Sequence, residues 1–118
     1  MSCKLRSIKV QVILWGAQRL SALVLALCVL VHLATIIYAV RSGLTAAHIV
    51  SRLHQSSLWT VFYSLFVLAI AIHAPIGLRT VVAEWGYQGR IIDGLLGTIA
   101  LALVVGGFRA LFALQGLA

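Results

Sequence analysis

The sequence has 118 residues, of which 63% are hydrophobic and 9% charged, and its formal net charge is +7 at pH 7. A soluble domain of this length cannot bury so much apolar surface, which predicts that lipid surrounds most of the chain. The positive charge does not indicate binding to nucleic acid, because the basic residues fall at the ends of apolar stretches and form no single polar face.

Three stretches are apolar and long enough to cross a membrane, which takes about 20 residues per helix. They cover approximately residues 12–40, 58–82 and 91–114, joined by short polar connections. We therefore predict an all-α fold: a single membrane-anchor domain, 1–118, that is a transmembrane three-helix subunit of a helix bundle. No room remains for a soluble catalytic domain. The first stretch is too long for the apolar part of a cleaved signal peptide, so we expect it to be retained.

The basic residues predict the orientation of these helices. Six of them lie at the end that holds the N-terminus and two at the opposite end, which places the N-terminus in the cytoplasm. Arg109 lies inside the third stretch near its far end, where it is expected to snorkel or to meet a partner helix. The six are Lys4, Arg6, Lys9, Arg19, Arg79 and Arg90, and the two are Arg41 and Arg52.

Small and polar side chains follow one face of the first predicted helix. They recur at three- and four-residue steps, as residues on one helix face do. In lipid, such a stripe is expected to face protein or a cofactor. The two cysteines, Cys3 and Cys28, form no CxxC motif, so neither iron–sulfur nor structural zinc ligation is indicated. The stripe consists of Ser21, Leu25, Cys28, His32 and Thr35.

The second predicted helix carries a comparable stripe around His73. Gly77 lies one turn beyond His73 and leaves space where a flat ring could lie, and Pro75 is expected to bend the helix. The stripe consists of Phe62, Phe66, Ala69, His73, Gly77, Thr80 and Glu84.

The third predicted helix has no histidine, and its glycines predict close helix packing without assigned chemistry. The first connection, 41–57, contains His48, Arg52 and His54, which are expected to be solvated, with room for a short interfacial helix. The glycines of the third helix are Gly94, Gly97, Gly106 and Gly107.

Histidines inside a membrane helix serve as haem ligands, as proton relays or as hydrogen-bonding groups between helices. A relay usually needs acids within the span, whereas the only two acids, Glu84 and Asp93, lie near the inner end. His73 is about 9 Å from Arg79 along its helix, and His32 is about 20 Å from Arg19. The two histidines should therefore differ in depth by about 10 Å, which makes one haem bridged by both awkward. Ligation and hydrogen bonding both remain open for each residue.

Two segments resemble a known family. Segment 73–87, HAPIGLRTVVAEWGY, closely resembles the second-helix signature of the succinate dehydrogenase cytochrome b subunits, in which an acid follows the arginine five residues later. Segment 18–21, QRLS, resembles the His-Arg-x-Ser/Thr start of their first helix. Three helices in a chain of this length fit the same family, although the specific motifs cover only these two segments.

The resemblance implies roles for particular residues. His73 would be the axial ligand of haem b, and Arg79 and Arg19 would lie near the haem propionates. Glu84 would lie near the iron–sulfur subunit. The implied quinone site comprises Arg19, Ser21, Trp15 and Gln18.

Departures from the family pattern also carry information. Gln18 replaces a histidine, Thr80 replaces a histidine or aromatic residue, and Trp15 stands where a quinone-binding serine is common. The quinone pocket is therefore expected to be built differently. His32 matches the mid-helix histidine of two-haem members of the wider superfamily, which would make it a second axial ligand.

The implied protein is the membrane anchor of a complex in the inner (cytoplasmic) membrane that passes electrons from an iron–sulfur subunit to quinone. It would bind one or two haem b groups, shared with a second anchor subunit, and would need a flavoprotein subunit for succinate oxidation. Two alternatives stay open. One is a cytochrome b subunit of another quinone-linked complex, and the other is a haem-free structural or transport protein of the membrane.

Overall fold

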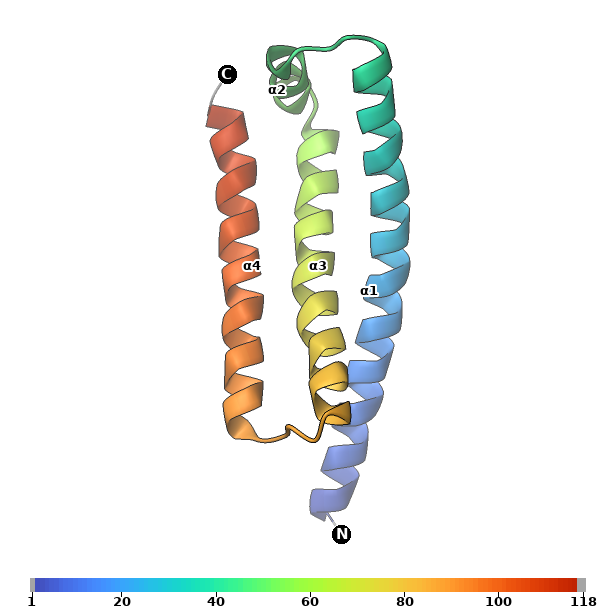
Figure 1. The fold of residues 1–118 in the computed structure, drawn as a ribbon, viewed down its shortest axis with the longest axis vertical. Coiled ribbons are helices and arrows are strands. Elements are labelled where there is room, and N and C mark those ends of the chain that lie inside the picture. Colours follow the sequence, from blue (N-terminus) through green and yellow to red (C-terminus); the bar gives the residue numbers. More distant parts are fainter. Residues whose placement is uncertain (1, 117–118) are drawn as a thin grey trace.

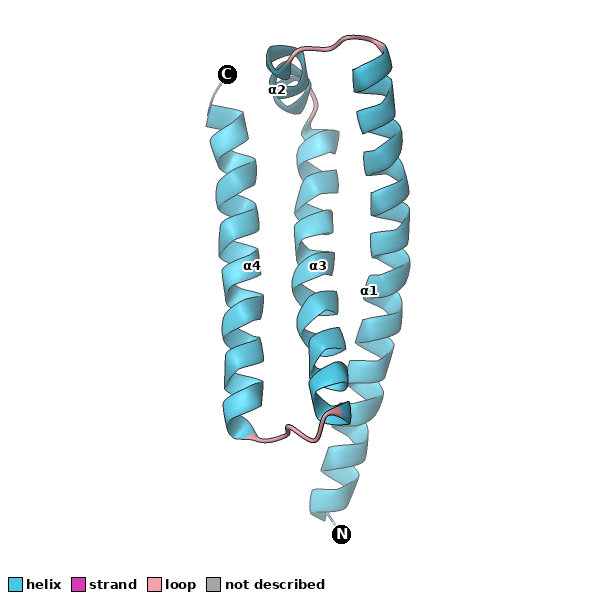
Figure 2. Cartoon of the chain, viewed as in Figure 1, coloured by secondary structure: helices cyan, strands magenta, loops and turns pink. Residues whose placement is uncertain are grey.

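The computed structural model describes residues 2–116, and side chains at positions 7–52 and 54–116. Its elements are α1 (Ser2–Arg41), α2 (Ala46–Gln55), α3 (Ser57–Glu84) and α4 (Arg90–Gly116). Figure 2 shows helices and loops only, with no strand among the described residues. The predicted all-α class is therefore confirmed. Three helices, at Ser7–Arg41, Ser57–Glu84 and Arg90–Gly116, are long and apolar enough to cross a membrane.

The helix bounds depart from the expected ones mainly at the N-terminus. α1 begins at Ser2, ten residues before position 12, whereas α3 and α4 begin and end within two residues of the expected positions. A helix needs apolar side chains only where lipid surrounds it, so a polar segment can continue α1 beyond the membrane. The side chains of Lys4 and Arg6 lie outside the described residues. The short helix expected in the first connection is α2.

Helix α3 lies between α1 and α4 and packs against both, while α1 and α4 do not pack on each other (Figure 1). The N-terminus and the α3–α4 connection lie at one end of the bundle, and α2 and the C-terminus lie at the other. This alternation of ends agrees with three successive membrane crossings. Below, we call these the N-terminal end and the α2 end.

Small side chains fill most of the helix contacts. Buried positions include Ser21 and Cys28 on α1, Ala69, Ala71 and Pro75 on α3, and Leu96 and Leu111 on α4. Small residues let membrane helices approach closely, so that dispersion contacts can hold them together without a hydrophobic driving force. Most long apolar side chains, by contrast, are exposed and are available to lipid or to other subunits.

The predicted faces of the first two spans are largely confirmed. On α1, Ser21 and Cys28 are buried, and the other three residues of the stripe are half-buried. On α3 the stripe is buried or half-buried from Phe62 to Gly77, but Thr80 and Glu84 are exposed. The stripe therefore turns outward where α3 reaches the N-terminal end of the bundle.

The expected glycine packing of α4 is found at one position. A Cβ atom on Gly107 would lie 2.6 Å from Cγ1 of Val67. The backbone of α4 therefore lies directly against a side chain of α3 at this position. At Gly94, Gly97 and Gly106 a Cβ would meet nothing within 4 Å. These three glycines lie away from α3.

Helix α3 runs without interruption through the buried Pro75. The expected bend at this residue stays a prediction. Near the end of α3, Gly86 and Gly89 adopt φ values of 86° and 138°, which glycine tolerates best, and so turn the chain into α4.

Polar contacts close both ends of the bundle. At the N-terminal end, Nε of Arg79 donates to Oδ1 of Asp93 at 3.0 Å, which joins α3 to α4. At the α2 end, Nε2 of His54 contacts the carbonyl of Gln115. Gln115 in turn donates from Nε2 to Oγ1 of Thr60 at 2.6 Å. α2 is thereby held across the ends of α3 and α4.

Candidate functional site

His73 lies at the α1–α3 contact, where it meets the hydroxyl of Ser21. Nδ1 of His73 is 3.5 Å from Oγ of Ser21, at the long end for a hydrogen bond. Oγ of Ser21 also donates to the carbonyl of Gln18 at 3.1 Å, and Ser21 is only 5% exposed. The three groups form a chain that crosses from α3 to α1.

The direction of this chain favours one histidine tautomer. Because the Ser21 proton is directed to the Gln18 carbonyl, Oγ is left to accept from Nδ1–H of His73. A neutral imidazole with its proton on Nδ1 has its lone pair on Nε2. Metal-binding histidines commonly have this arrangement, with the second nitrogen held by a hydrogen bond.

Gly77 lies next to Gln18. A Cβ at Gly77 would lie 3.1 Å from Nε2 of Gln18, so the amide of Gln18 occupies the space that the glycine leaves. Oε1 of Gln18 is buried and has no hydrogen-bond partner among the described residues. The end of the flexible Gln18 side chain occupies this space in the present arrangement of α1 and α3, and the expectation that a flat ring lies beside Gly77 stays a prediction.

Trp15 and Arg19 lie on a different face of α1. The Arg19 guanidinium carbon is 5.2 Å from the centre of the Trp15 ring, and both side chains are exposed. Arg19 and Ser21 are two positions apart on α1, so their side chains leave the helix about 160° apart around its axis. The structure thus brings Ser21 and Gln18 to His73, but places Trp15 and Arg19 away from it.

Arg79 lies about two turns beyond His73 on α3, at the N-terminal end. Its Nε is directed to Asp93, and the two side chains are 46% and 54% exposed. An arginine has five N–H donors, so the Nη groups of Arg79 remain for another acceptor. An open cavity of about 530 Å³ adjoins this pair and is lined by Glu84 and Tyr87 among others.

His32 lies at a different depth from His73. Its ring centroid is 6.0 Å from that of Tyr63 and 5.7 Å from that of Phe66. Phe66 precedes His73 by seven residues, or about 10 Å along α3. The predicted difference in depth is confirmed, and it separates the two histidines along the bundle. Nδ1 of His32 is buried and has no hydrogen-bond partner within the described part of the chain.

The remaining histidines belong to the surface at the α2 end. His48 pairs through Nδ1 with Oγ1 of Thr45 at 2.8 Å, and His54 contacts Gln115. Among the described residues no three His, Cys, Asp or Glu side chains gather in a way that could hold a metal ion.

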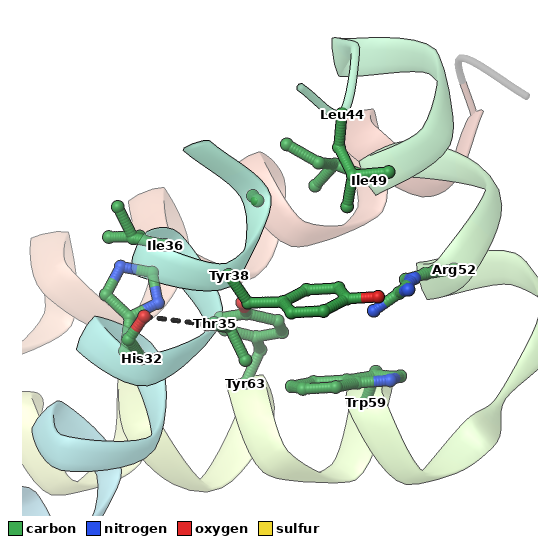
Figure 3. Close-up of a pocket in the computed structure, with 10 residues that line it drawn as sticks. His32, Thr35, Ile36, Tyr38, Leu44, Ile49, Arg52, Trp59 and Tyr63 are labelled. Carbon is green, nitrogen blue, oxygen red and sulfur yellow. Dashed lines mark hydrogen bonds between the residues drawn. The ribbon is translucent and has the colours of Figure 1, made fainter. Parts of the chain in front are cut away.

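Two features of the site escaped the sequence analysis. Asp93 was assigned no partner, although the tight turn with Gly86 and Gly89 brings the start of α4 back beside Arg79. A pocket of about 250 Å³ between α1, α2 and α3 was also missed; it is lined by His32, Tyr38, Arg52 and Trp59 among others (Figure 3). The amphipathic pattern of α2 was the one available signal for it.

Comparisons with known proteins give one match. No curated protein and no solved structure is similar enough to match this chain. Residues 1–112 match the family described as succinate dehydrogenase/fumarate reductase transmembrane subunit, which is nearly the whole sequence. The chain therefore belongs to the succinate dehydrogenase/fumarate reductase transmembrane subunit family.

Proposed function

We propose that this protein is the haem b-containing membrane anchor of a succinate:quinone oxidoreductase, and that it helps to pass electrons from the iron–sulfur subunit to quinone. Membership of the family supports the membrane-subunit role. The observation that carries the haem assignment is the hydrogen bond between Nδ1 of His73 and Ser21, which leaves Nε2 available. Flavoprotein and iron–sulfur subunits would oxidise succinate, since this chain holds no complete active site.

In this proposal His73 would hold the iron of haem b through Nε2, and Ser21 would orient the imidazole. Such second hydrogen bonds fix the ring and raise its basicity as a ligand. When bound, haem b supplies one-electron transfer, at a potential set by its axial ligands and surroundings. The second axial ligand would come from a second anchor subunit, because His32 is too far along the bundle to share one iron with His73.

Arg79 is the proposed partner of a haem propionate, whereas Arg19, which the resemblance also assigned to the propionates, lies on the face of α1 away from His73. Arginine pairs with carboxylates through two parallel N–H groups, and Arg79 keeps its Nη groups free beside Asp93. Asp93 would therefore act as a positioning residue, because it holds the Arg79 side chain by Nε alone. Glu84 is exposed at the same end and would face the iron–sulfur subunit.

Quinone would bind near Trp15 and Arg19, at the N-terminal end. The guanidinium of Arg19 is stacked on Trp15 and is free to donate to a quinone carbonyl, where negative charge develops on reduction. Ser21 and Gln18, which the resemblance placed in the quinone site, lie on the His73 side of α1. We therefore assign Ser21 to the histidine, and propose that the buried, unpaired Oε1 of Gln18 accepts a hydrogen bond only from the hydroxyl of the reduced quinol, because a quinone has no donor.

The excess of basic residues at the N-terminal end supports a cytoplasmic location for that end, in the inner (cytoplasmic) membrane. The succinate-oxidising subunits would dock there. Family membership disfavours both alternatives weighed from the sequence, and leaves a haem-free anchor of the same family as the competing proposal.

A pyridine haemochrome assay on the intact complex tests the proposal by giving haem b per copy of this chain. We expect at least one haem in the wild type, loss of that haem in His73→Leu, and retention in His48→Leu, a matched change on exposed α2. Complex assembly is measured in parallel by subunit ratio. A complex that assembles without haem, or keeps its haem in His73→Leu, would refute the assignment.

A second haem on His32 is the second candidate. His32 is half-buried within the bundle, as a ligand would be, but its buried Nδ1 has no partner among the described residues, unlike that of His73. Axial histidines usually donate this second N–H, so we propose His73 as the first ligand. Two haems per complex, one of them lost in His32→Leu, would establish the second site.

A further inference from the structure

At the α2 end, a pocket of about 250 Å³ opens between the last turns of α1, the middle of α2 and the first turns of α3. Figure 3 shows aromatic rings and aliphatic side chains around it, with Arg52 of α2 at its edge. We propose that this pocket binds one phospholipid with an anionic headgroup, whose phosphate pairs with Arg52 and whose acyl chain fills the pocket. The proposal goes beyond the haem and quinone function: it does not depend on haem at His73, and it is incompatible with a second haem at His32, which lines the same pocket.

The wall of the pocket suits a hydrocarbon chain. Ile36 and Ala39 line it from α1, Leu44 and Ile49 line it from the following turn and α2, and Trp59 and Tyr63 line it from α3. Oγ1 of Thr35 donates to the carbonyl of His32 at 2.7 Å, so these two polar groups have partners, and Nδ1 of His32 is the one buried polar side-chain atom of the wall without a partner among the described residues. A mainly apolar lining favours an acyl chain over a ligand that needs several hydrogen bonds.

The edge of the pocket suits an anion. The guanidinium carbon of Arg52 is 5.2 Å from the centre of the Tyr38 ring, and this contact holds the charge beside the opening. Both acidic side chains of the sequence, Glu84 and Asp93, lie at the opposite end of the bundle, so neither can pair with Arg52. Arginine binds phosphate through parallel N–H groups, which makes a phosphate the complementary partner.

The depth of the pocket also fits a lipid. Trp59 and Arg79 are separated by 20 residues of α3, or about 30 Å, which is the thickness of a bilayer core. A tryptophan and an arginine are typical of the two membrane boundaries. Arg52 and Trp59 then lie at headgroup level, and Tyr63 lies about 6 Å further in. A lipid seated here would keep its phosphate and its chain at their normal depths.

The test uses native mass spectrometry of the intact complex, titrated with phosphatidylglycerol in a neutral detergent. We expect the wild type to bind one phosphatidylglycerol tightly, and Arg52→Gln to weaken that binding about 10-fold or more, as loss of a charge-assisted pair would. The matched control is Arg41→Gln, an exposed arginine at the same end that does not line the pocket. It should bind as the wild type does.

Further binding measurements distinguish the contribution of the lipid headgroup from that of the acyl chain. Inorganic phosphate alone should not compete, because it lacks the chain, and phosphatidylcholine should bind more weakly because its headgroup has no net charge. Ala39→Phe fills the pocket from α1 and should also weaken binding of phosphatidylglycerol. If the complex does not assemble with Ala39→Phe, the comparison of the wild type with Arg52→Gln, a change on exposed α2, still tests the proposal.

Three results would overturn the proposal. The first is equal binding of phosphatidylglycerol by the wild type and Arg52→Gln. The second is an equal loss in Arg52→Gln and Arg41→Gln, which would show attraction by general surface charge only. The third is a second haem lost in His32→Leu, because that haem would occupy the same pocket. Lipid count and haem count are separate readouts, so the failure of this proposal is distinguishable from that of the haem proposal.

Discussion

At the scale of single residues, the main result is the pairing of His73 with Ser21. The family motif places a hydroxyl at position 21 in the quinone site, but in the structure Oγ contacts Nδ1 of His73. One buried hydroxyl therefore favours the tautomer in which Nε2 of the imidazole is available. The same helix presents Arg19 on an exposed face. The proposed histidine-orienting residue, Ser21, and the proposed quinone-binding residue, Arg19, are therefore close in sequence but lie on different faces of α1.

Replacing Ser21 by Ala should weaken haem binding while leaving the ligand in place. Loss of a hydrogen bond to a ligating histidine typically lowers metal affinity about 10-fold or more. Haem retention by the purified complex during dilution, followed by the Soret band, measures this. The control is Ser64→Ala, since Oγ of Ser64 bonds only to the carbonyl of Thr60 in its own helix. Equal retention in both variants would contradict the positioning role of Ser21.

Replacing Arg19 by Gln should reduce quinone reduction without affecting succinate oxidation. A charge-assisted hydrogen bond contributes about 1.5–3 kcal/mol, so kcat/KM for quinone should fall about 10- to 100-fold. Succinate oxidation with a soluble dye as acceptor should stay at the wild-type rate. Arg41→Gln, at the opposite end, provides the control. An unchanged kcat/KM for quinone would place the quinone elsewhere.

At the scale of helices, α3 is the element on which the other two spans pack. Small residues contribute to its contacts, and among the glycines of the neighbouring helices Gly107 of α4 lies tightest against it, next to Val67. The sequence showed four glycines in α4 but could not tell which of them packs against another helix, because the residue type alone does not identify its neighbours. The structure assigns the close approach to Gly107 and leaves Gly106 facing open space.

Replacing Gly107 by Ala should therefore destabilise the α3–α4 contact, whereas Gly106→Ala should not. The new Cβ would lie 2.6 Å from Val67 Cγ1, and overpacking of this kind costs about 1–3 kcal/mol. Thermal denaturation in detergent measures the difference, with a lower midpoint expected for Gly107→Ala only. Combining it with Val67→Ala should restore part of the loss. Identical midpoints for the two glycine variants would show that α3 and α4 are further apart.

At the scale of the whole molecule, the chain is a set of membrane helices that carries much exposed apolar surface. Few side chains are buried within it, and those that are buried are mostly small. Lipid and other subunits must cover the rest, which fits a multi-pass membrane subunit of a larger complex. The arrangement also places the N-terminus and the α3–α4 connection at one end.

The proposed orientation is testable by labelling single cysteines with a membrane-impermeant maleimide. Gln88→Cys, in the α3–α4 connection, should react only in inverted vesicles, and Ser42→Cys, after α1, only in right-side-out vesicles. Both positions are exposed. Cys3→Ser removes one native thiol, and Cys28 is 4% exposed and should stay unlabelled. The reverse pattern would place the N-terminus outside the cytoplasm.

The sequence alone determined the features that depend on local pattern. Hydropathy over about 20 residues predicted three spans, because lipid leaves a backbone little choice but the helix. Spacing along each helix predicted which residues share a face and how far apart His32 and His73 lie, because rise and rotation per residue are constant. A short helix in the first connection was expected only as an interfacial segment, and its bounds and amphipathic face come from the structure.

Only the tertiary structure decided which groups meet across helices. The contacts of Ser21 with His73, Gln18 with Gly77, Arg79 with Asp93, and Val67 with Gly107 depend on how helices pack and rotate against one another. Membrane helices pack through many small dispersion contacts, so no single sequence motif predicts which residues will meet. The pocket at the α2 end arises in the same way, since three elements separated in sequence must converge to enclose it.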